Sequence, residues 1–310
     1  LESIPGMKVF VSEEHFIKQV NDIGLAIIGQ TASLVPADKK LYALRDVTGT
    51  VESTPLIASS VMSKKLASGS DCILLDVKFG NGAFMKNAKS AEELAKIMCK
   101  IGNALGRDTR AVLTDMDQPL GHAVGNALEI KEAIATLHGQ GPKDFTDLCL
   151  RSGAIMLEQA KIVKSEEEGM EMLQKSIDDG SAFEKLKAMV KAQGGDVSYI
   201  EHPEKFPLAK HIVEVKANKG GYIKQIVALE IGESAMRLGA GRETFDDVID
   251  MSAGIVLNKK VGDKVDKGDV LCVVHTNKEN FDSILKDIEN SFIIVDEFVK
   301  VPPTVHAYIK

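Results

Sequence analysis

Ser60 and Lys64 are the side chains in this sequence whose types and spacing first suggest chemistry. They lie four residues apart in a segment predicted to be helical, and this spacing places both on one helical face. Arg45 ends the preceding predicted helix, one short turn away. One hydroxyl and two cations could therefore converge on a small polar ligand. A planar heterocycle with carbonyl oxygens would suit these donors.

Spacing alone leaves a second interpretation of the same residues open. Lys64 and Arg45 could be the solvated ends of a helical hairpin, because lysine and arginine are common on protein surfaces. On spacing alone, this second interpretation is favoured.

A glycine-bearing loop provides a weaker signal. The segment 76–85 follows the predicted buried strand 72–77, and ligands of α/β folds gather at the carboxyl ends of strands. A plain turn would need the same glycines for its backbone, and the pattern is not a phosphate-binding P-loop. Further along, Leu120, Ala123 and Glu132 bracket a turn and a predicted helix, where Glu132 alone would be taken as a surface acid.

The elements that must position these residues alternate between helix and strand. Helices are predicted at 36–45 and at about 56–65, the second with Thr54 as its cap and Pro55 in its first turn. Strands at 72–77 and 110–115 flank a helix opened by a capping box at Ser90. This order predicts an α/β fold.

A composition change at 194–207, rich in glycine, proline and charge, predicts a domain boundary. We expect an α/β core at 1–206, with part of a helical lobe at about 36–66, and a small α+β domain at 207–310. The turn 261–271 resembles the hairpin of biotinyl and lipoyl carrier domains, and Lys278 lies about where a carrier's acceptor lysine would be. The residues around it lack a carrier's context, so Lys278 is interpreted as a turn lysine.

Bulk properties exclude several classes of protein. The 310 residues carry a formal net charge of −7, which argues against binding a nucleic-acid backbone. Four separated cysteines form neither a disulfide framework nor a zinc motif, so a reducing, cytoplasmic location is expected. We expect no membrane partner, because no apolar stretch is long enough to span a bilayer.

The chain resembles the thymidine and pyrimidine-nucleoside phosphorylases. The resemblance covers essentially the whole chain in order, through residues 41–51, 59–65, 76–85, 118–132, 239–242 and 261–271. It implies a glycosyltransferase fold: a partial helical lobe and mixed α/β core, followed by a small α+β domain of hammerhead type. It also implies reversible phosphorolysis of uridine, thymidine and deoxyuridine to the free base and (deoxy)ribose 1-phosphate.

The resemblance assigns roles to particular residues and favours the ligand-binding interpretation of the first cluster. It implies that Arg45, Ser60 and Lys64 hold the pyrimidine base, with Arg45 and Lys64 catalytic and Tyr42 lining the pocket. A potassium ion is implied at the backbone carbonyls of Leu120 and Ala123 and the carboxylate of Glu132, oxygen ligands that suit a hard cation. Inorganic phosphate is the implied co-substrate, with no organic cofactor, and a homodimer is expected.

The sequence also departs from the family pattern. The family's Lys-x-Ser-Thr-Gly-Gly type phosphate loop and its Ser-Gly-Arg-Gly segment precede the part that matches residues 1–6, and neither is present here. We therefore expect an N-terminally truncated enzyme, with its phosphate ligands upstream of Leu1 and little activity alone. Two alternatives stay open: a phosphoribosyltransferase of related fold, and a lipoyl-like carrier or interaction module.

Overall fold

The structure is a computed structural model of the chain. It describes residues 1–29, 35–48, 50, 53–244 and 246–310, and only the backbone of residues 42, 43 and 45–47. The chain forms two compact units, each assembled from separate segments: Leu1–Ile28, Asp117–Thr146 and Ser176–Pro302 in the first, and Gly29–Met116, Asp147–Lys175 and Pro303–Lys310 in the second. The domain boundary expected after residue 206 stays a prediction.

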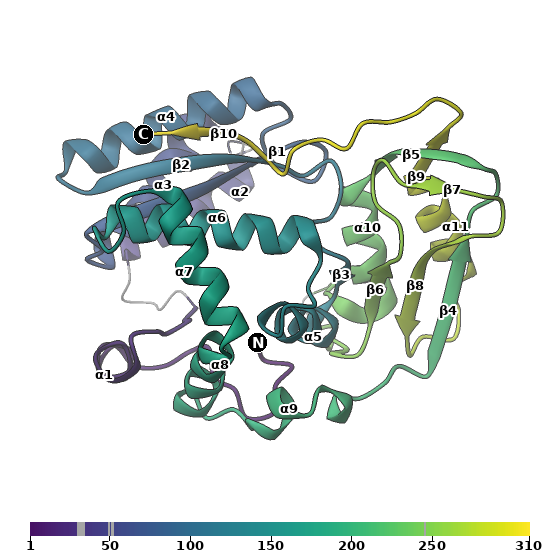
Figure 1. Ribbon diagram of the computed structural model, residues 1–310, viewed down its shortest axis with the longest axis horizontal. Coiled ribbons are helices and arrows are strands. Elements are labelled where there is room, and N and C mark those ends of the chain that lie inside the picture. Colours follow the sequence, from purple (N-terminus) through teal and green to yellow (C-terminus); the bar gives the residue numbers. More distant parts are fainter. Residues whose placement is uncertain (30–34, 49, 51–52, 245) are drawn as a thin grey trace. The chain divides into compact units, whose positions relative to one another are not determined.

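A three-stranded sheet organises the second unit. β1 (Cys72–Phe79) pairs in parallel with β2 (Asp108–Asp115), and β10 (Val305–Ile309) pairs antiparallel with the other edge of β2. Figure 1 shows β10, drawn in yellow at the C-terminus, beside the blue β2. Apolar side chains alternate with more exposed ones along β1, which buries one face of that strand.

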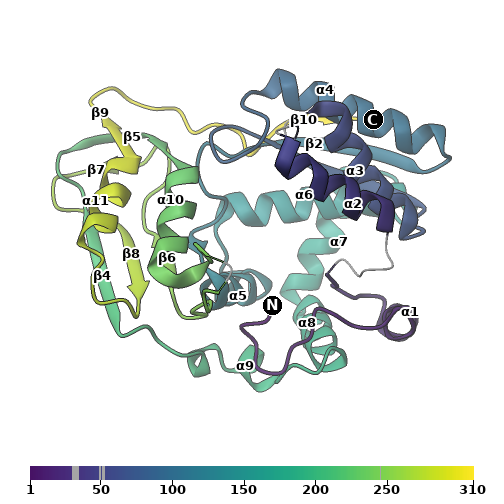
Figure 2. The same cartoon turned by 180° about the vertical axis from the view of Figure 1, so that it is seen from behind.

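The second unit contains helices as well, two of which form the hydrophobic core together with this sheet. The helices are α2 (Pro36–Thr48), α3 (Thr54–Ala67) and α4 (Ala88–Ala104), with most of α6 (Lys143–Gln159) and of α7 (Glu166–Asp178). Figure 2 shows α2 beside α3. The core joins α3, α4 and the strands through Ala58, Met62, Leu75, Leu94, Met98 and Leu113.

The end of α2 and the starts of α3 and α4 differ from the sequence prediction. α2 continues to Thr48, where a break was predicted, and the Thr48 hydroxyl donates to the Leu44 carbonyl at 2.9 Å, which extends the last helical turn. Ser53, not Thr54, is the N-cap of α3. Asn87 caps α4 by accepting from the Ser90 amide at 2.9 Å, so the helix begins before the predicted capping box.

The first unit has a helical part around its own core. Its helices are α1 (Glu13–Ile23), α5 (Asn126–Leu137), α8 (Ser181–Ala192) and the short α9 (Ser198–Glu201), followed by a 3₁₀ turn at Pro203–Lys205. The core contains Ile4, Ile134, Met189, Ile200 and Phe206. Gln193 binds the N-terminal segment through its side chain, donating to the carbonyls of Lys8 and Ile27 at 2.8 Å each.

The same unit contains two antiparallel sheets. One has the order β3-β6-β8-β4, with β3 (Ala123–Val124), β6 (Gly254–Leu257), β8 (Val270–Thr276) and β4 (His211–Lys216). The other has the order β7-β5-β9, with β7 (Lys264–Val265), β5 (Gly221–Ile226) and β9 (Phe292–Val295). α10 (Ala228–Ala235), a π turn (Met236–Ala240) and α11 (Asp282–Ser291) pack beside them.

This β-rich part confirms the small α+β domain expected at the C-terminus. Its core includes Ile223, Ile231, Leu257, Cys272 and Ile288. The burial of Cys272 raises the pKa of its thiol to about 12, as expected for a small buried hydrophobe. β3 lies far earlier in the chain and yet pairs with β6, so the turn that precedes β3 is held against the C-terminal strands.

Candidate functional site

Ser60 and Lys64 lie together, as their spacing predicts. The Lys64 ammonium donates to the Ser60 hydroxyl at 2.9 Å and to the Ser60 carbonyl at 3.0 Å. Ser60 is buried, with 6% of its surface exposed, although the helical repeat places it on the side of α3 opposite to Ala58 and Met62.

Asp38 completes this cluster, and sequence reasoning missed it. Its carboxylate accepts from the Lys64 ammonium at 2.5 Å, and the Asp38 and Lys64 side chains are 10% and 29% exposed. An ammonium has three N–H donors, and these three contacts use them all. An acceptor on a ligand would therefore replace one of the Ser60 contacts while Asp38 keeps the ammonium in place.

Tyr42 and Arg45 belong to α2, but their side chains lie outside the described part of the chain. The roles given to them stay predictions.

Residues 76–79 of the segment 76–85 belong to β1, so the loop begins later than predicted, and its own hydrogen bonds close it. The Gly80 amide donates to the Met85 carbonyl at 2.9 Å, and Gly80 has φ of +114°, a conformation that needs glycine. Beside it, Lys78 donates to the Asp76 carboxylate at 2.7 Å and to the buried Thr114 hydroxyl at 3.0 Å. Thr114 also donates to Asp76, which gives a polar cluster at the carboxyl ends of β1 and β2.

Glu132 binds the turn that leads into β3. Its Oε1 accepts from the amides of His122 and Ala123, both at 2.8 Å. Gly121 has φ of +68°, and a Cβ placed there would lie 2.2 Å from the Glu132 Oε2. Burial raises the pKa of Glu132, although the two amide donors oppose this. Only a glycine lets the turn close this tightly over the carboxylate.

These residues fit a hard monovalent cation. A half-buried carboxylate held by neutral amides gains from a nearby positive charge, and backbone carbonyls are the usual additional ligands of such ions. Within the described residues, no group of three or more His, Cys, Asp or Glu side chains could hold a metal ion. A cation at this turn would therefore be held mainly by backbone carbonyls, with the carboxylate of Glu132 as a side-chain ligand.

Lys260 and Asp144 also lie at this turn, and sequence reasoning missed both. The Lys260 ammonium contacts the Asp144 carboxylate at 2.8 Å and the Gly121 carbonyl at 2.7 Å, and it also donates to the Pro119 carbonyl. Asp144 accepts from the Gly121 amide at 3.2 Å. Sequence spacing gives no signal for these contacts, since 139 residues separate Lys260 from Gly121.

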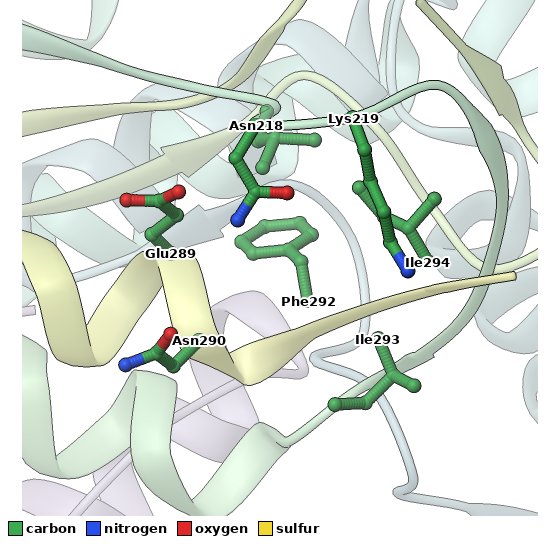
Figure 3. A pocket seen from close by; sticks show the side chains of 8 residues that line it. Asn218, Lys219, Glu289, Asn290, Phe292, Ile293 and Ile294 are labelled. Carbon is green, nitrogen blue, oxygen red and sulfur yellow. The ribbon is translucent and has the colours of Figure 1, made fainter. Parts of the chain in front are cut away.

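Hollows are present among the described residues of the first unit. One, of about 180 Å³, is lined by Asn218, Lys219, Glu289, Asn290 and Phe292 among others, and Figure 3 shows their side chains. It is smaller than the roughly 300–1,000 Å³ typical of ligand pockets. Another hollow, of about 280 Å³, lies at the N-terminus of α5 beside Ala240 and Gly241 of the 239–242 segment.

The segment expected to resemble a carrier hairpin belongs to the sheets of this unit. Lys278 follows β8, where its amide donates to the Thr276 hydroxyl at 3.1 Å and its ammonium lies 3.5 Å from Glu243. These contacts agree with a turn lysine. In the part of the chain that the structure describes, no helix has both the length and the apolar character needed to cross a bilayer.

Two family models match this chain and show the class of protein to which it belongs. Residues 1–183 match the family described as "Glycosyl transferase family, a/b domain", so the chain is an enzyme of the glycosyltransferase class. Residues 222–295 match the "Pyrimidine nucleoside phosphorylase C-terminal domain". The chain therefore belongs to the pyrimidine-nucleoside phosphorylase family. This confirms the resemblance and the fold class predicted from the sequence.

Individual relatives agree with this assignment. The chain is 55% identical to a pyrimidine-nucleoside phosphorylase of Staphylococcus epidermidis over 309 residues, which is 100% of this chain and 71% of the relative. With the same coverage, it is 53% identical to the enzyme of Staphylococcus haemolyticus and 52% identical to that of Staphylococcus aureus.

Proposed function

We propose that this chain contains the base-binding part of an enzyme that phosphorolyses pyrimidine nucleosides, namely uridine, thymidine and deoxyuridine. A phosphate oxygen forms a bond to C1′ of the sugar while the bond from C1′ to the base nitrogen breaks. The electron pair of the broken bond leaves with the base, and the sugar becomes a (deoxy)ribose 1-phosphate. The cluster of Lys64, Ser60 and Asp38, in a chain of this family, is the observation that carries the proposal.

Lys64 and Ser60 act on the leaving base. Negative charge builds on the ring and its carbonyl oxygens as the bond breaks, and donors already in position stabilise this charge without reorganising. The buried carboxylate of Asp38 binds the Lys64 ammonium, so the Lys64 side chain is already ordered before the reaction begins. Arg45 is proposed as a second donor to the base, and Tyr42 as part of the pocket wall.

A potassium ion is proposed at the carbonyls of Leu120 and Ala123 and the carboxylate of Glu132. The burial of Glu132 and its closeness to Gly121 support this, because the carboxylate is held within a tight turn of backbone dipoles. When bound, such a cation supplies positive charge that rigidifies the turn. The chain's own part is to present the oxygen ligands.

Further parts of the proposal concern the intact protein. We propose that the residues that bind phosphate lie outside these 310 residues and that the chain alone turns over slowly or not at all. The active form is proposed to be a cytoplasmic homodimer.

Phosphate-dependent release of uracil from uridine, followed by chromatography, tests the proposal. The 310-residue chain is compared with a version extended at its N-terminus by the family's preceding segment. The extended enzyme should release base only with phosphate, and Lys64→Met should lower kcat/KM at least 100-fold. Lys65→Met is the matched control, because Lys65 neighbours Lys64 on α3 and is exposed. Phosphate-independent release, or equal losses in both variants, would overturn the proposal.

A further inference from the structure

The Lys260 side chain is enclosed by oxygens of a distant turn. Its ammonium contacts three of them: the carbonyls of Pro119 and Gly121 and the carboxylate of Asp144. The Lys260 side chain is 15% exposed and that of Asp144 is 23% exposed, so water screens the contacts only in part.

Neighbouring bonds connect the same two stretches of chain. The Val261 amide donates to the Gln118 side chain at 3.0 Å, and the Leu257 amide donates to the His122 carbonyl at 2.8 Å. Ala123 then pairs with Val256 in the sheet. The turn at 118–123 is therefore bound along its length by residues 256–261, with Lys260 supplying the only full positive charge among these contacts.

Electrostatics explains why a cation is needed at this position. The two carbonyls present partial negative charges to the same point, and the nearby Asp144 adds a full one. Without a cation these oxygens would repel one another, and the turn would reduce that repulsion by changing its peptide orientations or by opening to water. An ammonium has three N–H donors and can bind all three oxygens at once. Its positive charge then has the same place among the oxygens that a coordinated metal cation would have.

We infer that Lys260 is a positioning residue, a tethered cation that fixes the 118–123 turn and, through it, Leu120, Ala123 and Glu132. Leu120 lies between the two carbonyls that bind the ammonium, and the next two amides bind Glu132. The part of this inference that concerns cation ligands rests on the potassium site proposed above. The part that concerns the turn does not.

An adjacent lysine provides a matched control. Lys259 lies 3.5 Å from Asp269, and these side chains are 28% and 40% exposed. An ion pair this open contributes little to stability. Lys259→Met removes the same charge from the neighbouring position without touching the turn.

Amide hydrogen exchange of residues 117–124 tests the turn directly. Lys260→Ala should speed exchange of the Gly121, His122 and Ala123 amides at least tenfold, whereas Lys259→Met should leave it unchanged. Propylammonium chloride should restore slow exchange in Lys260→Ala, and propanol should not, since propanol fills the same space without charge. Unchanged exchange, or equal rescue by both compounds, would overturn the inference.

A second variant covers the case in which Lys260→Ala does not fold. Asp144→Asn leaves the lysine in place and removes one of its three partners. It should speed exchange of the His122 and Ala123 amides, which donate to Glu132, at least threefold, and a smaller increase would count against the inference.

Potassium titration of the N-terminally extended protein separates this inference from the proposed cation site. At constant ionic strength, the concentration of potassium that gives half of the thermal stabilisation should rise at least fivefold in Lys260→Met. If wild type shows no potassium dependence, the proposed site fails, while the exchange data still decide the role of Lys260. If potassium binds both proteins equally, the link from Lys260 to the cation ligands is overturned.

Discussion

Gly121→Ala is the substitution whose effect can be worked out most directly from the structure. The new methyl group would lie 2.2 Å from the Glu132 Oε2 and 3.0 Å from its Cδ, distances at which a neighbour must move. Glu132 would have to leave its place, and with it the hydrogen bonds to His122 and Ala123. The backbone would also carry a side chain at φ of +68°.

The expected cost has two parts. A non-glycine residue in the left-handed region costs about 1–2 kcal/mol. A hydrogen bond to a charged group contributes about 1.5–3 kcal/mol, and water replaces part of it because Glu132 is half-buried. With both Glu132 bonds weakened, we expect the unfolding free energy to fall by about 3 kcal/mol, of which about 2 kcal/mol comes from Glu132.

Gly24→Ala isolates the backbone part. Gly24 lies in the same unit with φ of +75°, and a Cβ there would have nothing within 4 Å. Urea denaturation followed by circular dichroism should show a loss of about 1 kcal/mol for Gly24→Ala and about 3 kcal/mol for Gly121→Ala. Equal losses in the two variants would refute the reasoning that Glu132 is held against the Gly121 backbone.

Three further changes test other parts of the structure. Asp38→Asn should lower kcat/KM for uridine roughly 10- to 100-fold in the extended enzyme, because Lys64 loses its charged partner. Steady-state kinetics measures this, and an unchanged kcat/KM would exclude Asp38 as the residue that positions Lys64. Arg110 lowers the pKa of Asp108 by a side-chain hydrogen bond, so the charged Asp108 stabilises the folded wild-type protein above the unfolded pKa of 3.8. This contribution to the free energy of unfolding should be lost as the pH falls from 3.8 through the lower folded pKa. Asp108→Asn should remove that part of the acid dependence in pH-resolved thermal melts, and identical pH profiles would contradict it. Gly102→Ala should destabilise its unit by about 1–3 kcal/mol in thermal melts, because the new methyl would lie 1.9 Å from the hydroxyl of a facing threonine on β2; a melting temperature equal to wild type would contradict this.

The sequence predicted the parts of the site that depend on local periodicity. Ser60 and Lys64 are four residues apart, and the helical repeat alone brings them to one face. The alternation of strands and helices likewise predicted the α/β class. In both cases the relevant contacts are set by neighbours along the chain.

Tertiary packing determined the parts that the sequence did not predict. Asp38 reaches Lys64 from 26 residues away because α2 packs on α3, and no spacing rule connects them. β10 joins β2 from the far end of the chain. Leu120, Ala123 and Glu132 came from family resemblance alone, since an acid after a turn has no local signature of a ligand.

Capping shows how a correct element can have a wrong boundary. Ser90 was expected to open α4, but Asn87 lies one turn earlier and its side chain caps the helix by binding the Ser90 amide. Asparagine and serine are comparable N-caps, so local preference could not choose between them.

The central claim is that Lys64 and Ser60 stabilise negative charge on the departing base. Phosphorolysis of two nucleosides whose bases differ in the stability of their anions tests this claim most directly. Fluorine at C5 makes the uracil anion more stable, so 5-fluorouridine depends less on donors from the enzyme. In the N-terminally extended enzyme, Lys64→Met should lower the single-turnover rate on uridine at least tenfold more than on 5-fluorouridine. Equal losses on both substrates would show that Lys64 does not act on the leaving base.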